Sequence, residues 1–154
     1  MSAADADTGG DERIVAVSRV IAAEPSIIFD LLADPARHHE IDGSDTVVAA
    51  NDKNPDRLTL GARFGMSMRF GLPYRMTSEV VEFVEDEVIA WRHLGHHVWR
   101  YRLTPVEGGT EVTESFNWGV ARFPPMYEWV GYPERHRRNM TRTLERLEAV
   151  VTAD

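Results

Sequence analysis

The sequence predicts an α+β domain in which an antiparallel sheet packs against one long C-terminal helix. Three observations lead to this fold class. A strand pattern near the start runs into a helical pattern, six further strand patterns fill the middle of the chain, and one amphipathic helix pattern ends it. Because strands joined by short turns pair as antiparallel hairpins, and an amphipathic helix must bury its apolar face, we expect the helix to cover one face of the sheet.

The first strand and two short helices are predicted near the start of the chain. Ile14–Ile21 is rich in β-branched residues, which favours a strand, and Pro25 is well placed to start a helix. An apolar stripe at helical spacing follows: Ile27, Ile28, Leu31 and Leu32. Asp34-Pro35 ends or kinks this helix, and residues 36–40 predict a second short helix.

The middle of the chain predicts a run of antiparallel strands, and the end predicts a helix. The expected strands are residues 46–50, 60–70, 74–84, 88–94, 98–106 and 110–120. Gly71-Leu72-Pro73 predicts one turn, and Gly108-Gly109 is a strong signal for a two-residue hairpin loop. The closing helix is expected over residues 133–151, with a single apolar stripe made by Met140, Leu144, Leu147 and Val151.

Composition limits the classes of function. The chain has 154 residues, a formal net charge of -8 and no cysteine, which excludes disulfides and thiolate metal sites. We expect one domain over residues 12–152, after an acidic, Gly-containing lead-in (residues 1–11) that reads as disordered. This charge argues against a nucleic-acid partner, and no apolar run approaches the ~18 residues of a membrane span. The lead-in does not resemble a signal peptide, so the expected location is cytoplasmic.

Strand register predicts which side chains face the helix. With Gly108-Gly109 as the loop, Glu107 pairs with Thr110, so the inner face carries Trp99, Tyr101, Leu103, Val112, Glu114, Phe116 and Trp118. Arg100, Arg102, Glu111 and Thr113 then lie on the outer face. The preceding hairpin agrees with this pattern if residues 95–97 form a three-residue loop that pairs Trp91 with Tyr101.

The histidines of Trp91–Tyr101 are therefore not expected to converge. His96 and His97 fall on an exposed loop tip, whereas His93 points inward between tryptophans as a hydrogen-bonded wall residue or a ligand contact. A zinc site needs three or four ligands around one point, so we predict no metal here.

Several polar residues are predicted on this apolar inner face. Phe64, Met66 and Met68 should share it, with Val81 and Phe83 further along, and Glu79 and Arg75 are included with a less certain register. On the first strand, Arg19 shares a face with Val17 and Ile21. Because a buried charge is costly unless it is paired, we expect an Arg19–Glu114 ion pair, or the same groups orienting the polar end of a ligand.

Residues outside the inner face have plainer interpretations. A solvated rim is predicted for His38, His39, Glu40 and Asp42, with an entry gate or a ligand contact as the alternative. The arginines at positions 135, 137, 138, 142 and 146 read as a solvated helix face rather than a polyanion site. Phe123–Trp129 is apolar and either covers a cavity mouth or pairs two subunits into a homodimer.

Four stretches resemble the SRPBCC superfamily of START-like, helix-grip proteins, and within it the polyketide cyclase/dehydrase and lipid-transport-like family. They are VSRVIAAEPSIIFDLLADPARHHEID, VIAWRH with WRYRLTPVEGGTEVTESF, and MTRTLERLEAVV. The chain departs from the family pattern by carrying Glu24 between Ala23 and Pro25. The resemblance implies a seven-stranded antiparallel sheet wrapped around the C-terminal helix, with an apolar cavity between them that takes lipids, sterols or polyketides.

Two functions are consistent with this reading. The first is binding of a small hydrophobic or aromatic molecule, and the second is a cyclase/aromatase with His93 and Glu114 as acid–base candidates and Arg19 or Tyr101 stabilising an enolate oxygen. No cofactor is predicted. The expected ligand-binding residues are Arg19, Phe64, Met66, Met68, Trp91, His93, Trp99, Tyr101, Glu114, Phe116, Trp118 and Met140.

Overall fold

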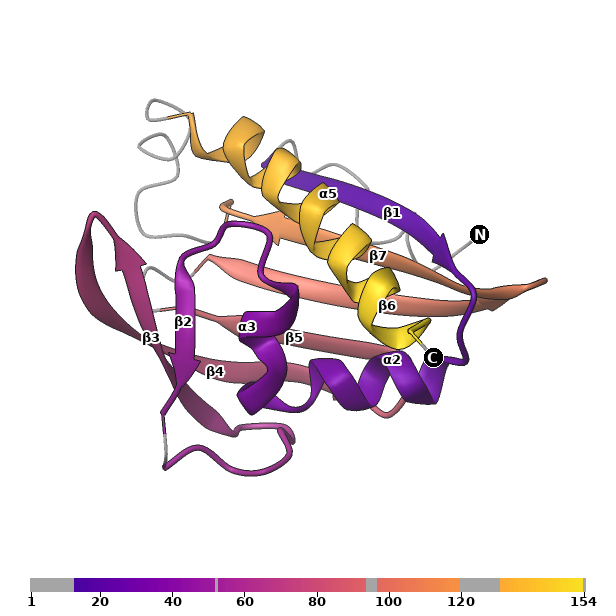
Figure 1. Ribbon diagram of the computed structural model, residues 1–154, viewed down its shortest axis with the longest axis horizontal. Helices are drawn as coiled ribbons and strands as arrows, with labels where there is room; N and C mark the ends of the chain where they lie inside the picture. The colour runs from indigo at the N-terminus through magenta and orange to yellow at the C-terminus, as the bar shows by residue number, and fades with distance from the viewer. Residues whose placement is uncertain (1–12, 52, 94–96, 120–130, 154) are drawn as a thin grey trace.

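The computed structural model describes residues 13–51, 53–93, 97–119 and 131–153. Its strands are β1 (Ile14–Ile21), β2 (Val47–Ala50), β3 (Arg63–Phe70), β4 (Leu72–Val84), β5 (Val88–Arg92), β6 (Val98–Val106) and β7 (Gly109–Asn117). Its helices are α2 (Pro25–Leu32), the 3-10 turn η1 (Pro35–Arg37), α3 (His38–Ile41) and α5 (Tyr132–Val151). The seven strands form one antiparallel sheet in the order β1-β7-β6-β5-β4-β3-β2, as Figure 1 shows. The predicted α+β helix-grip fold is confirmed.

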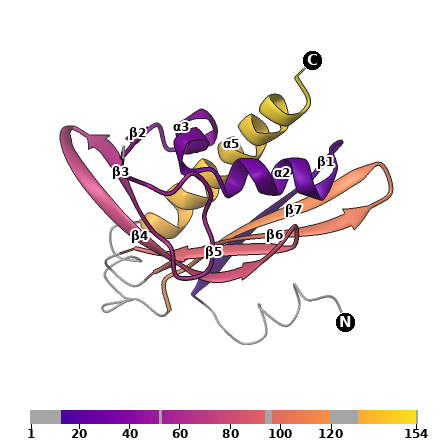
Figure 2. The same ribbon diagram turned by 90° about the horizontal axis from the view of Figure 1, so that it is seen from below.

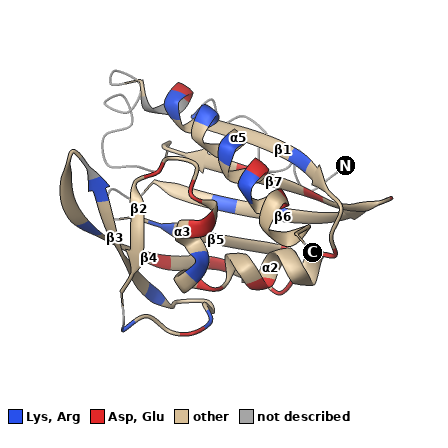
Figure 3. Ribbon diagram, in the orientation of Figure 1, with Lys and Arg blue, Asp and Glu red and all other residues tan. Residues whose placement is uncertain are grey.

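The helices lie on one side of a bent sheet. Figure 2 shows α2, α3 and α5 on the same face, while the β3–β4 hairpin curves upward at one end. Helix α5 crosses this face and packs on β1, β7 and α3. Charged residues recur along α5 (Figure 3), and among the described residues no helix has the length and apolarity needed to cross a membrane.

The core is built from the predicted apolar stripes, with one exception. Met140, Leu144 and Leu147 of α5 are almost fully buried. In α2, however, Ile27 is half exposed, and Phe29 is buried instead, with its ring 5.3 Å from that of Phe83. The prediction that Ile27 belongs to the buried stripe was therefore wrong, because the buried positions of this two-turn helix are 28, 29, 31 and 32.

Both predicted hairpin registers are displaced by two residues, which preserves the predicted faces. Val106 pairs with Gly109, so the loop is Glu107-Gly108, and Tyr101 lies opposite Glu114 rather than Phe116. Gly108 has a φ of 86°, which favours glycine, and a Cβ on Gly109 would lie 2.0 Å from the Ile21 carbonyl oxygen. Likewise Trp91 pairs with Trp99. A displacement by two keeps every side chain on its side of the sheet.

A β-bulge in β4 corrects the prediction for that strand. The register shifts between the Val80–Trp91 and Glu82–Ala90 pairs, so Val81 is an extra residue and is exposed. Phe83 packs on the core as predicted. Before the bulge, however, the even-numbered residues of β4 face inward, whereas the prediction had the odd-numbered residues facing inward. Glu79 and Arg75 consequently lie on the outer face, contrary to expectation, and a Glu79 carboxylate oxygen is 3.9 Å from an Arg92 nitrogen.

Some expectations fall on residues that lie outside the described part of the chain. They concern the lead-in 1–11, His96 and the Phe123–Trp129 segment.

Candidate functional site

A cavity of about 590 Å³ lies between the inner face of the sheet, α5 and the segment from α3 to β2. Its apolar wall is made mainly of rings and methionines. Nine of the twelve residues predicted to contact a ligand line it: Phe64, Met66, Met68, Trp91, His93, Trp99, Tyr101, Glu114 and Met140.

The other three predicted residues do not line this cavity. Phe116 and Trp118 are buried beside it, with stacked rings 5.9 Å apart, in a core cluster shared with Val15 and Met140. Arg19 lies on the helix-facing side of β1 but is substantially exposed, and its guanidinium is 3.0 Å from the carboxylate of Glu148 on α5. The predicted Arg19–Glu114 pair is therefore wrong. Strand β1 is an edge strand, so its arginine reaches solvent beside α5 instead of the interior.

Glu114 is a carboxyl group buried in the cavity wall. The residue is 3% exposed, and the Tyr101 hydroxyl donates a 3.0 Å hydrogen bond to its Oε1. Burial raises the pKa of Glu114 to about 8, an effect that the Tyr101 hydrogen bond opposes and the charge of Asp42 reinforces. Burial, together with Glu114, also raises the pKa of Tyr101. At neutral pH, therefore, this pair carries no charge for most of the time.

Three histidines gather at one end of the cavity. The rings of His93 and His97 are 4.9 Å apart, and His136 of α5 lies 4.8 Å from Trp99 and 4.4 Å from Phe116. His93 Nδ1 shares a 2.9 Å hydrogen bond with the Ser78 hydroxyl. Its inward direction was predicted correctly, but the exposed position expected for His97 was wrong, because that side chain lines the cavity beside His93.

These imidazoles are neutral at ordinary pH. Burial lowers the pKa of His93 to about 3, with further lowering from His97 and His136, and lowers those of His97 and His136 to about 4. Within the described ranges, no group of three or more His, Cys, Asp or Glu side chains is arranged to hold a metal ion. The cluster therefore adds hydrogen-bonding rings to the wall without adding positive charge.

His38 was expected on a solvated rim and is instead part of the wall. It is 8% exposed, its ring stacks 5.1 Å from Trp91, and its Nε2 donates a 2.8 Å hydrogen bond to the Leu32 carbonyl oxygen. Burial lowers its pKa. The neighbours His39 and Glu40 are exposed, as a rim requires.

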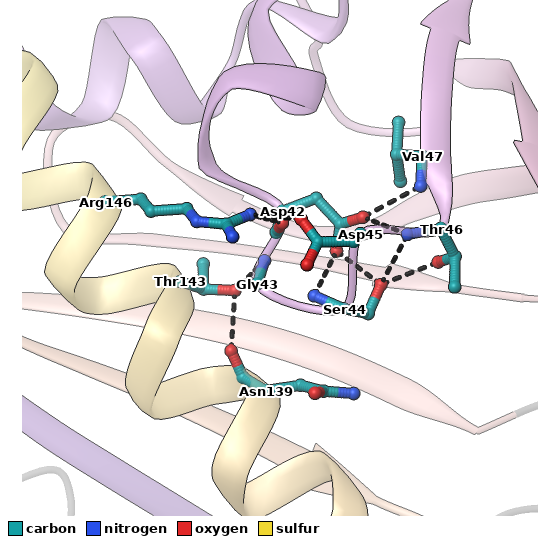
Figure 4. Close-up of polar contacts among 9 residues, drawn as sticks. All are labelled: Asp42, Gly43, Ser44, Asp45, Thr46, Val47, Asn139, Thr143 and Arg146. Atoms are coloured by element: carbon teal, nitrogen blue, oxygen red, sulfur yellow. Dashed lines mark hydrogen bonds and ion pairs between the residues drawn. The ribbon is translucent and has the colours of Figure 1, made fainter.

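The loop after α3 forms the polar side of the cavity and is fixed to α5. The Asp42 carboxylate accepts hydrogen bonds from the backbone N–H groups of Ser44, Thr46 and Val47 at 2.8–3.0 Å. From α5, the Thr143 hydroxyl accepts a 2.9 Å bond from the Gly43 N–H, and Arg146 donates to the Asp42 carbonyl oxygen, as Figure 4 shows. Since this loop lines the cavity, these contacts determine its shape.

Sequence reasoning missed several cavity residues, some of which left a usable signal. Tyr74, Met76 and Ser78 pair with Met68, Met66 and Phe64, so a correct β3–β4 register would have found them. His136, Asn139 and Thr143 lie one helical turn from Met140 or directly beside it. The loop residues Ser44 and Thr46 follow no period and left no such signal.

Comparisons with known proteins agree with this architecture. Residues 12–152 match the model of a family described as polyketide cyclase / dehydrase and lipid transport. The uncharacterized protein Rv0088 of Mycobacterium tuberculosis is 36% identical over 133 residues, which cover 82% of this chain and 59% of that protein. This chain thus spans about three fifths of the length of that relative.

Solved structures show the same fold. Protein CV1439 of Chromobacterium violaceum has a TM-score of 0.73 at 18% identity, covering 92% of this chain and 99% of its own. An AHSA1-like protein of Aeromonas hydrophila has a TM-score of 0.67 at 13% identity, covering 92% of this chain and 96% of its own. At these identities the likeness concerns the fold alone.

Proposed function

Since the chain belongs to the polyketide cyclase / dehydrase and lipid transport family, we propose that it binds a small hydrophobic or aromatic molecule in the cavity between sheet and α5. The observation that carries this proposal is a cavity of about 590 Å³ walled by Phe, Trp, Tyr and Met side chains. That volume is in the usual range for small-molecule sites.

The largely uncharged sheet side of the wall supports an uncharged ligand, whereas the charged side chains of Asp42 and Arg135 line the side formed by the α3–β2 loop and α5. Lowered pKa values keep His93, His97 and His136 neutral, and the raised pKa of Glu114 keeps a proton on its carboxyl group near pH 7. Ring faces such as those of Trp91 and Trp99 offer large contact areas to a flat apolar molecule. The net charge of -8 disfavours nucleic acid as a competing partner.

A titration with a neutral apolar dye such as N-phenyl-naphthylamine tests the proposal. We expect saturable binding to the full chain, together with an apolar compound recovered by mass spectrometry from denatured protein. Met76→Trp should fill the cavity and weaken dye binding at least about tenfold, equivalent to roughly 1.4 kcal/mol. Thr77→Trp is the control, because Thr77 is an exposed neighbour on β4. Equal binding by wild type and both variants would contradict the proposed site.

Acid–base catalysis of the cyclase/aromatase kind is a second candidate, and the Glu114 carboxyl favours it. A pKa of about 8 inside a substrate-sized cavity suits a group that both donates and accepts a proton at neutral pH. His93 suits that role less well, since its pKa is about 3 and it bonds to Ser78. Turnover of a poly-β-ketone mimic that is lost in Glu114→Gln but kept in His93→Gln would support this candidate.

A further inference from the structure

Within the described part of the chain, the two oxygens of the Glu114 carboxyl group differ in their hydrogen bonding. Oε1 accepts the hydrogen bond from Tyr101, but Oε2 is buried and has no hydrogen-bond partner among the described residues. An unsatisfied buried polar atom lowers the stability of the folded state, so such atoms are rare in folded proteins. Glu114 lines the cavity, where an apolar side chain of similar length would avoid this cost.

The hydrogen bond from Tyr101 favours Oε2 as the oxygen of Glu114 that carries the proton. The Tyr101 hydroxyl has one proton and gives it to Oε1, so the proton of a neutral Glu114 carboxyl belongs on Oε2. Burial, opposed by Tyr101 and reinforced by Asp42, raises the pKa of Glu114 to about 8 and so supports the neutral form. Glu114 lines the cavity, so its neutral carboxyl adds an O–H donor to a wall made mainly of apolar side chains.

We propose, building on the binding function above, that Glu114 Oε2 donates a hydrogen bond to one uncharged oxygen of the ligand, with Tyr101 as the positioning residue. This assigns the ligand to the class of ring-containing molecules with a carbonyl or similar neutral acceptor. A ligand carboxylate is disfavoured at this position because Asp42 already contributes negative potential there. A hydrocarbon is disfavoured because it leaves Oε2 without a partner.

The geometry makes Glu114 a determinant of specificity as well as affinity. A ligand without an acceptor leaves the buried donor unpaired, and this lowers its affinity. Such a loss distinguishes two ligands more strongly than a difference in apolar contact does. The hydrogen bond from Tyr101 to Oε1 restricts rotation of the carboxyl group, so Oε2 cannot turn freely towards another partner within the protein. Tyr101→Phe should therefore reduce the preference for an oxygen-bearing ligand while leaving apolar contacts in place.

Competition of the matched pair fluorenone and fluorene against the bound dye tests this at pH 6.5 on the full chain. We expect wild type to prefer the ketone about tenfold or more. Glu114→Met should abolish the preference, whereas Glu114→Gln should retain part of it, because an amide N–H can donate. Glu111→Gln is the control, since Glu111 lies on the same strand and faces the outer side. Circular dichroism checks that each variant is folded.

The outcomes separate this inference from the function on which it rests. If the dye binds but fluorenone and fluorene compete equally in wild type, the Glu114 anchor is wrong and the binding cavity stands. If the amine analogue of fluorene competes better than fluorenone, the carboxyl is ionised in the complex and the neutral-donor assignment fails. If neither the dye nor either compound binds, the proposed function and the anchor fail together.

Discussion

Gly43 lies directly against the backbone of Asn139 on α5. A Cβ built on Gly43 would be 2.1 Å from the Asn139 carbonyl oxygen and 2.7 Å from the Thr143 nitrogen. This is an approach that only glycine permits, and it brings the cavity-lining loop close enough for the Gly43 N–H to reach the Thr143 hydroxyl.

Gly43→Ala should therefore destabilise the protein and disturb the cavity together. We expect a loss of roughly 1–3 kcal/mol or more in the free energy of unfolding, because backbone atoms must move to make room. Urea denaturation measures this loss. Gly65→Ala is the matched control, since its Cβ would meet its nearest neighbour, Asn51 Nδ2, at 3.4 Å. Equal losses in both variants would contradict the close contact as the cause.

Glu114 should make stability fall as the pH rises. Folding raises its pKa from 4.5 to about 8, so between these values the folded state binds more protons than the unfolded state. The stabilisation is present below the unfolded pKa and is lost as the pH rises through the folded pKa, with a slope of at most about 1.4 kcal/mol per pH unit. Urea unfolding at pH 5, 6.5 and 8 should show wild type losing stability relative to Glu114→Gln. A constant difference would argue that the carboxyl is ionised throughout.

The histidine cluster should have the opposite effect on the acid side. Folding lowers the pKa of His136 from 6.5 to about 4, so its contribution is complete above pH 6.5 and is lost as the pH falls through the folded pKa. We expect His136→Gln to lose less stability than wild type between pH 6.5 and 4.5. His39→Gln is the control, because the His39 side chain is exposed and does not line the cavity. Parallel curves for all three proteins would refute burial of the His136 ring.

Arg19 should be dispensable for ligand binding. Its ion pair with Glu148 is solvent-exposed, and such pairs contribute little to stability. We expect Arg19→Met to keep the wild-type affinity for the apolar dye and nearly the wild-type unfolding midpoint, measured by fluorescence titration and by thermal denaturation. A marked loss of dye affinity would indicate that Arg19 contacts the ligand, which would contradict its position beside α5.

The sequence was most informative where a period of two or 3.6 residues could be followed. Alternation correctly predicted that Trp99, Tyr101 and Glu114 share one face. The predicted β6–β7 loop lies one residue after the observed loop, which changes the strand pairing by two residues and so keeps each side chain on the same face. The α5 stripe at Met140, Leu144 and Leu147 was equally clear.

Prediction failed where one residue broke the period or where a partner was distant. Because Val81 is an extra residue in β4, the residues before it face the opposite side from the one predicted, and Glu79 faces outward. The local sequence contains no pattern that predicts this bulge. Arg19 was assigned to Glu114 by face alone, whereas its partner Glu148 lies on α5. Which carboxylate Arg19 reaches depends on where the helix crosses the sheet, and strand periodicity carries no information about that crossing.

The strand order also has a consequence for how the chain must fold. Strand β1 precedes the other described strands in the chain, and among them it pairs with β7 alone, so Ile14 leaves the ribosome roughly a hundred residues before its neighbour Asn117 exists. Contacts so distant in sequence slow folding, because a long loop must close before they form. The other six strands are joined in order as successive hairpins and can assemble as they emerge. Strand β1 therefore cannot take its place in the sheet until β7 has been synthesised.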